Sequence, residues 1–244
     1  MSPLKVVALT APLLLMLGCN KPTPEVTKSS GGGTTATTPA GTDAKAANQA
    51  LVRFINATPD SKDLSFGDLR AFPGVPARSA SAYQLIPSER HDFKLLTTGG
   101  ASVDPLATNS ESPSAGMHYS VLALADNGGK YSLKVLNDDA SRPAPGKAKV
   151  RVIHAAAGVE KVDAYPVTGK DPLISGISFN SATNYKEVDP ATMELDIRVE
   201  GSKKNLMNIK EVRLDADKLY TIILFGGNGQ PPTAKVIEDQ LLPK

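Results

Sequence analysis

The stretch Val52-Arg53-Phe54-Ile55-Asn56-Ala57 is followed, 98 residues later, by Val150-Arg151-Val152-Ile153-His154-Ala155. Repetition at a fixed spacing indicates a duplicated unit. Four further matches keep the same order: Tyr83 with Tyr185, 91–95 with 193–197, 119–122 with 220–223, and 134–138 with 235–239. We therefore expect two tandem domains, residues 50–140 and 147–244, each of an ordinary domain size.

Each half has the residue pattern of β-strands. Residues 193–200 alternate apolar and charged side chains, and residues 162–165 alternate likewise. A period of two sends one set of side chains into a core and the other into water. Residues 219–225 are nearly all apolar, which favours a central strand. We predict an all-β fold of two tandem immunoglobulin-like antiparallel β-sandwich domains.

The N-terminus has the features of a secretory signal. Lys5 supplies a positive charge, and residues 6–17 form an apolar run that is too short to span a bilayer as a helix. The run ends at Gly18 and Cys19, the single cysteine of the chain. The alternative is a core helix with an incidental cysteine. We predict a signal peptide over residues 1–18.

Residues Met16-Leu17-Gly18-Cys19 resemble the bacterial lipobox. That resemblance implies cleavage between Gly18 and Cys19 and attachment of diacylglycerol to the cysteine sulfur. Several acyl chains, each methylene contributing about 0.8 kcal/mol, would hold the protein stably at a membrane. The expected location is the cell envelope. Asn20 implies the outer membrane if the organism has two membranes.

Residues 19–49 are rich in Thr, Gly and Pro and have no apolar periodicity. Such a composition buries too little surface to offset chain entropy, so we expect a flexible tether after the lipidated cysteine. An O-glycosylated stalk is the alternative reading of its threonines.

Several short motifs of both halves together resemble the bacterial family called domain of unknown function 4397. The motifs are 150–156, 162–165, 177–179, Tyr185, 217–222 and 236–239 in the second half, and 52–60 with Tyr83 in the first. The first half departs at Asn56, which replaces His154, and at 64–66, which replace 162–164. The resemblance implies secreted or envelope β-sandwich domains, often in tandem. It implies no established activity, so no catalytic residue is carried over.

Few residues in this chain point to chemistry. His154 ends a repeated strand, where a structural hydrogen bond to loop backbone is expected. His91 and His118 are replaced by Met193 and Leu219 in the other half, which indicates tolerant edge or surface positions. No histidine spacing suits zinc, so we expect no metal and no cofactor. His154, Asp163 and Tyr165 are the candidate loop contacts for a ligand.

Two other patterns have a structural and a functional interpretation. Asp138-Asp139 and Glu238-Asp239 lack the spacing of a calcium loop, so solvated strand ends are expected. Asn127-Gly128-Gly129 and the glycines at 226–229 lie between apolar runs. They favour tight hairpins over a phosphate-binding loop, which would open a helix.

A net charge of +2 without a basic stripe argues against nucleic acid as a partner. The leading hypothesis is a non-catalytic module that binds a cell-wall polymer, a glycan or a protein partner, and that contacts the membrane through its lipid anchor. One alternative is an extracytoplasmic hydrolase or accessory subunit, with a site between the domains. The other is a small-ligand carrier, which needs a deep apolar pocket.

Overall fold

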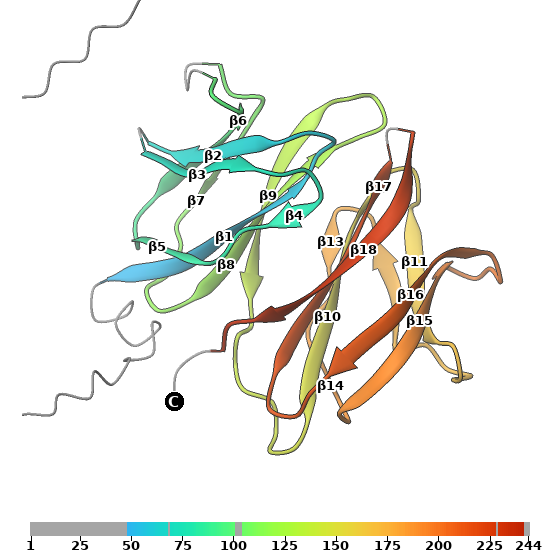
Figure 1. The fold of residues 1–244 in the computed structure, drawn as a ribbon. Coiled ribbons are helices and arrows are strands. Elements are labelled where there is room, and N and C mark those ends of the chain that lie inside the picture. Colours follow the sequence, from blue (N-terminus) through green and yellow to red (C-terminus); the bar gives the residue numbers. More distant parts are fainter. Residues whose placement is uncertain (1–47, 68, 101–103, 228, 242–244) are drawn as a thin grey trace, which may run out of the picture. The chain divides into compact units, whose positions relative to one another are not determined.

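The structure is a computed structural model that describes residues 48–67, 69–100, 104–227 and 229–241 (Figure 1). The regular elements of these ranges are β-strands, which confirms the predicted all-β class. No helix in the same ranges has the length and apolarity needed to cross a membrane. The predicted signal peptide, Gly18, Cys19 and almost all of the tether lie outside the described residues.

The first half forms a sandwich of two sheets. Its strands are β1 (Gln49–Ala57), β2 (Lys62–Phe66), β3 (Leu69–Val75), β4 (Ser79–Ala80), β5 (Gln84–Pro87), β6 (His91–Thr97), β7 (Ala107–Glu111), β8 (His118–Ala125) and β9 (Tyr131–Asp138). One sheet has the order β4-β1-β8-β9, with β5 also paired to β1, and the other has the order β3-β2-β6-β7.

The second half repeats this arrangement strand for strand. Its strands are β10 (Ala148–Ala156), β11 (Lys161–Pro166), β12 (Ile174–Ser178), β13 (Ser181–Ala182), β14 (Lys186–Val188), β15 (Ala191–Val199), β16 (Asn205–Leu214), β17 (Leu219–Gly227) and β18 (Gln230–Asp239). The sheets have the orders β13-β10-β17-β18, with β14 on β10, and β12-β11-β15-β16. We call two residues that the duplication relates sister residues.

Each half departs from the predicted antiparallel pattern at one strand pair. β1 runs parallel to β8, and β10 runs parallel to β17. Parallel neighbours need a long crossover between them. Here the crossover is the opposite sheet of the same sandwich, which the chain builds between β1 and β8 and again between β10 and β17.

Three apolar clusters separate four sheets. The first lies inside the first sandwich, and the second lies inside the second sandwich. The third joins the outer faces of the two five-stranded sheets, with members on β1, β8 and β9 from one half and on β10 and β17 from the other. We call this third contact the interface between the halves.

The interface explains why the repeated strands are buried on both faces. In β1, Val52 and Phe54 point into the first sandwich, whereas Ile55 belongs to the interface. Arg53 is 2% exposed on that same outer face. The nearly continuous apolar run of β17 has the same cause, and its position between β10 and β18 confirms the predicted central strand.

The glycine-rich segments connect antiparallel neighbours, as predicted. Residues between β8 and β9 form a hairpin, in which the Asp126 amide donates to the Lys130 carbonyl at 3.0 Å. Gly129 has a φ of 79° there, a left-handed conformation that glycine adopts at little cost. β17 and β18 pair in the same way on either side of the second glycine cluster.

Candidate functional site

Two arginine–aspartate ion pairs cross the interface between the halves. Arg53 Nη1 on β1 lies 2.6 Å from Asp239 Oδ1 on β18, and Arg151 Nη2 on β10 lies 2.5 Å from Asp138 Oδ1 on β9. The side chains of all four residues are at most 3% exposed. Each half thus contributes one arginine and one aspartate to its partner, and we call these contacts the crossed pairs.

Residues of the same half hold each member of the crossed pairs in place. Arg53 Nε donates to Ser120 Oγ at 2.7 Å, and that hydroxyl donates to Asp138 at 2.7 Å. The Tyr83 hydroxyl also donates to Asp138, at 2.6 Å, and the Arg53 guanidinium lies 4.8 Å from the centre of the Tyr83 ring. Each carboxylate therefore has several donors, as a buried charge requires.

The second half repeats this support with its sister residues. Arg151 Nε donates to Thr221 Oγ1 at 2.9 Å, and Thr221 donates to Asp239. The Tyr185 hydroxyl donates to Asp239 at 2.6 Å, and its ring lies 4.7 Å from the Arg151 guanidinium. The network is consequently twofold in chemistry as well as in sequence.

The surroundings of the crossed pairs favour the charged forms of Asp138 and of both arginines. Burial by itself raises the pKa of the Asp138 carboxyl, but the guanidinium groups of Arg151 and Arg53 outweigh it, so that pKa lies below its ordinary value. Burial lowers the pKa of Arg53 and of Arg151, and the nearby acidic groups more than reverse this. Burial also raises the pKa of the Tyr83 and Tyr185 hydroxyls, which stay protonated as donors. The network is therefore structural in character.

The structure corrects two expectations from the sequence. Asp138 and Asp239 are not solvated strand ends, because they are 1% and 5% exposed. The outer face of their sheets is covered by the other half, and single-strand patterns do not reveal that cover. His91 and His118 are not surface residues either, because they are 6% and 0% exposed. His91 lies on β6, away from the interface, where it packs against Phe66 and Phe93. Asp139 and Glu238, the other members of the two acidic dipeptides, are exposed as predicted.

His118 breaks the twofold chemistry of the interface. Its ring packs edge-on against Tyr83 with the ring centres 5.1 Å apart, and neither ring nitrogen has a hydrogen-bond partner among the described residues. Burial lowers the pKa of this imidazole. Leu219 occupies the sister position, which agrees with an uncharged His118.

The three candidate loop residues have different surroundings, although Asp163 and Tyr165 both lie on β11. His154 is 0% exposed, accepts a hydrogen bond from the Ala156 amide at 3.3 Å and packs its ring against Phe179. Tyr165 is half-buried, with the Arg198 guanidinium 4.6 Å from its ring centre. Their contact with a ligand stays a prediction.

Asp163, the third candidate, has a role that both halves share. Asp163 Oδ1 accepts the Gly176 amide at 2.8 Å, beside a break in the β11–β12 register. Asp63 Oδ1 accepts the Gly74 amide at 2.5 Å, beside the corresponding break between β2 and β3. Asp63 is therefore the sister of Asp163, and the sequence alignment of residues 64–66 with 162–164 was wrong by two positions.

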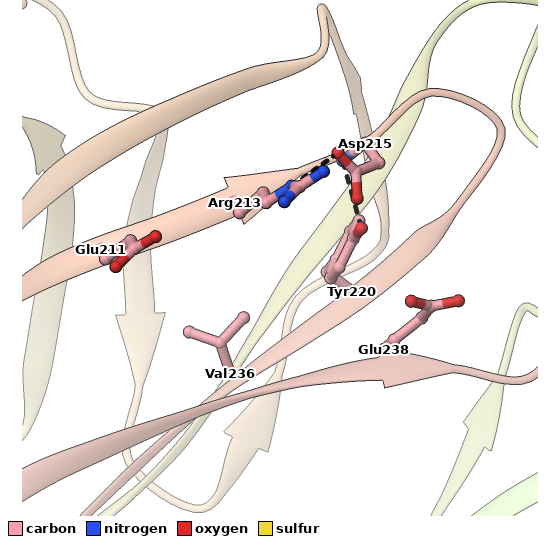
Figure 2. Close-up of a pocket in the computed structure, with 6 residues that line it drawn as sticks. All are labelled: Glu211, Arg213, Asp215, Tyr220, Val236 and Glu238. Atoms are coloured by element: carbon pink, nitrogen blue, oxygen red, sulfur yellow. Dashed lines mark hydrogen bonds and ion pairs between the residues drawn. The ribbon is translucent and has the colours of Figure 1, made fainter.

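An open groove lies along the second sandwich, between the edge strands β16 and β18 (Figure 2). Its volume is about 490 Å³. The lining residues come from β16, the turn after it, β17 and β18: Glu211, Arg213, Asp215, Tyr220, Val236 and Glu238. We call this feature the groove.

The groove presents charged groups around a small apolar floor. Arg213 Nε lies 2.9 Å from Asp215 Oδ1, and the Asp215 amide donates to the Tyr220 hydroxyl at 3.1 Å. The hydrogen bond from Arg213 to Asp215, together with their charge attraction, raises the pKa of Arg213. Glu238 is paired with Lys218 at 2.8 Å, and the side chains of Arg213 and Glu238 are 70% and 52% exposed. Such groups can donate to and accept from ligand hydroxyls.

The charges of the groove belong to the second half alone. His91 and Met193 are sister residues. His91 pairs with Glu111 on β7, and Met193 pairs with Val212 on β16, so Glu111 and Val212 are sisters as well. Sister positions of β7 and β16 are therefore 101 residues apart. At that separation, four lining residues have small uncharged sisters: Glu211 has Ser110, Arg213 has Ser112, Asp215 has Ser114, and Glu238 has Asn137. Tyr220 and Val236 keep their residue types as Tyr119 and Val135. The scaffold is shared, and its polar lining is not.

Sequence reasoning missed the groove. Its residues come from three strands and a turn, and β16 lies in a different sheet from β17 and β18, so no local motif joins them. A residue-by-residue comparison of the halves would have shown charged residues in the second half where the first half has serines, at every second position of one segment. That spacing indicates that the changed side chains share one face of the strand.

The chain is a tandem β-sandwich protein. The model of the family described as Domain of unknown function (DUF4397) matches residues 50–165, which confirms the predicted resemblance over that range. A comparison with curated proteins gave no match.

Two solved structures are similar to parts of the chain. The C-terminal domain of AlgF from P. aeruginosa has 20% identity and a TM-score of 0.33, over 38% of this chain and 99% of that one. A family CBM26 module of Amy13K from Eubacterium rectale, solved with maltoheptaose, has 14% identity and a TM-score of 0.28, over 78% of this chain and 97% of that one.

His154 predicts a specific loss of stability in acid. Burial lowers the pKa of His154 to about 4, from 6.5. Between these values the unfolded chain binds more protons than the folded chain, so stability falls as the pH drops from 6.5 toward 4 and is unaffected above 6.5. His154→Asn, which introduces the sister residue Asn56, should remove about 3 kcal/mol of that acid-induced loss.

Urea unfolding of both proteins at pH 7.5 and pH 4 measures this difference. Other buried groups titrate equally in the two proteins and cancel. An identical loss of stability in both proteins would show that His154 does not bind its proton on unfolding.

Proposed function

We propose that this protein is a lipid-anchored, non-catalytic binding module of the cell envelope, and that its groove binds a glycan. The groove carries the proposal, because it combines exposed carboxylates, a guanidinium and an apolar floor in an open channel. Glycan hydroxyls both donate and accept hydrogen bonds, so a lining of mixed polarity suits them. An open channel also admits an extended polymer, which an enclosed pocket would exclude.

The described structure favours binding over hydrolysis at the interface. A hydrolase between the halves would need carboxylates that a substrate can reach. Asp138 and Asp239 are clustered there, but their side chains are 1% exposed and are closed by arginine and tyrosine. Their oxygen lone pairs already accept hydrogen bonds within the network.

A small-ligand carrier has less support. It would need an enclosed apolar pocket inside a sandwich, whereas the inner clusters are packed with aliphatic and aromatic side chains. The groove opens to solvent, and four of its six lining residues are charged.

Anchoring would place this groove at a membrane without fixing its direction. Cys19 would carry the lipid, and the tether after it would let the two sandwiches reach a glycan beyond the lipid surface. A lone module with an open groove binds weakly, and many copies anchored on one surface would add avidity.

The groove proposal predicts a loss of glycan binding on exchange for sister residues. Arg213→Ser with Glu238→Asn should weaken binding about tenfold or more, because both side chains would lose charge-assisted hydrogen bonds to the ligand. The measurement is a glycan array with neutral, acidic and amino-sugar chains, followed by titration calorimetry on the best binder. The matched control is Lys170→Ser with Asp171→Asn, which removes the same two charges from an exposed loop.

Equal binding by the groove variant and the control would refute the groove as the binding site. Absence of any glycan binder, for a protein that still folds, would point to a protein partner instead.

The anchor predicts a change of location for Cys19→Ser. Without a sulfur to acylate, the protein should move from the membrane fraction to the soluble fraction, because acyl burial no longer holds it. Cell fractionation with immunoblotting measures the shift, and mass spectrometry of the wild-type N-terminus identifies the lipid. The proposal fails if the wild-type product retains an unmodified leader, or if the variant stays on the membrane.

A further inference from the structure

The interface between the halves has the character of a twofold dimer contact. Arg53 of the first half meets Asp239 of the second, and the sister residues Arg151 and Asp138 meet in the reverse sense. In such an isologous contact, each surface is complementary to a copy of itself. Either half therefore presents what the other half recognises.

The apolar part of the interface follows the same rule. All its members except Phe179 come as apolar sister pairs: Ile55 with Ile153, Leu122 with Ile223, Leu124 with Phe225, Leu136 with Ile237, Ala57 with Ala155, and Ala80 with Ala182. A half from one chain thus finds in a second chain the same charges and the same apolar surface that it meets in its own.

The connection between the halves is held by hydrogen bonds at the surface and by two small buried side chains. Residues 139–147 join β9 to β10, and Pro143 and Pro145 lie within them. The bond from the Ala144 amide to Glu187 is exposed, and those from Lys149 to Ser141 are partly buried. Ala140 and Pro143 are buried. Nine residues span up to about 30 Å when extended, so the connection can reach a second copy at the cost of these few contacts.

We propose that the interface is also a self-association surface, through which two copies of this chain exchange halves. In the exchanged dimer, the first half of each chain packs against the second half of the other, with the same crossed pairs. The dimer and the two monomers then have equivalent interfaces. The equilibrium between monomer and dimer therefore depends on the protein concentration relative to the effective concentration of one half near the other within a single chain, which the connection sets.

Two charge-reversed chains test the exchange directly. In a chain with Arg53→Asp, two carboxylates meet at the interface, and in a chain with Asp239→Arg, two guanidinium groups meet. Each chain alone has this repulsion both within itself and in a dimer with its own kind. In a mixture, the first half of the Asp239→Arg chain and the second half of the Arg53→Asp chain form a native interface.

The proposal predicts that an equimolar mixture forms a heterodimer, whereas each chain alone is a monomer. Both full chains would also carry Cys19→Ser to avoid the lipid, and they would be refolded together from denaturant. Native mass spectrometry distinguishes the heterodimer from either homodimer by mass, and light scattering confirms the doubled mass. The double variant in one chain should be monomeric, because its reversed pair is complementary within the chain.

A matched control uses an exposed ion pair inside the second half. Lys210→Glu and Glu194→Lys reverse a pair that lies 2.6 Å apart on one sandwich, so their mixture should stay monomeric. A mixture of the interface variants that also stays monomeric, while both chains retain the circular dichroism of folded strands, would overturn the proposal.

A measurement without interface variants covers the case in which they fail to fold. The chain with native halves, refolded over a range of concentrations, should show a dimer fraction that rises as the protein approaches the order of 1 mM, the effective concentration of a short connection. A chain that remains monomeric over that whole range would equally overturn the proposal.

Discussion

Four buried charges determine how the two halves of this protein meet. Moving an ion out of water costs several kcal/mol, and attraction offsets that cost only where geometry and extra hydrogen bonds are favourable. Arg53, Asp138, Arg151 and Asp239 meet this condition only while the two outer sheets face each other in one register. The apolar surface around them supplies most of the attraction, since burial of apolar area is not directional. The charges supply the orientation.

This division of roles relates the interface to the groove. β18 contributes Asp239 to the buried network and Glu238, the preceding residue, to the groove, because successive side chains of a strand point to opposite faces. The positions of this sheet that face the interface are constrained by packing in both halves. The exposed positions that line the groove are free to differ between the halves. At the corresponding edge, the first sandwich therefore has serines and the second sandwich has charged residues. The proposed binding would thus belong to one half, on a scaffold that both halves stabilise.

The all-β class, the duplication and the central strands could be predicted from the sequence, because period-two alternation and repeated motifs are local signals. The interface could not, although its residues stood in the repeated motif. Arg53 and Arg151 read as ordinary outward-facing residues of a strand, and nothing nearby in the sequence marks Asp239 and Asp138 as their partners. The buried histidines were misplaced because their replacement by Met193 and Leu219 is also compatible with a packed position. Asp63 was overlooked because two more residues separate Ala155 from Asp163 than separate Ala57 from Asp63, which shifts the alignment of β2 with β11. The groove was overlooked because its residues come from separate strands.

A double-mutant cycle across one crossed pair tests the central claim most directly. Urea unfolding of the wild type, Arg53→Met, Asp239→Asn and the double variant gives the coupling energy between the two side chains. Each single change should cost about 3–5 kcal/mol, since it leaves a buried charge without its partner. The double variant should cost less than the sum by at least about 1 kcal/mol. Additive costs would contradict the account, because they would mean that Arg53 and Asp239 do not meet in the folded protein.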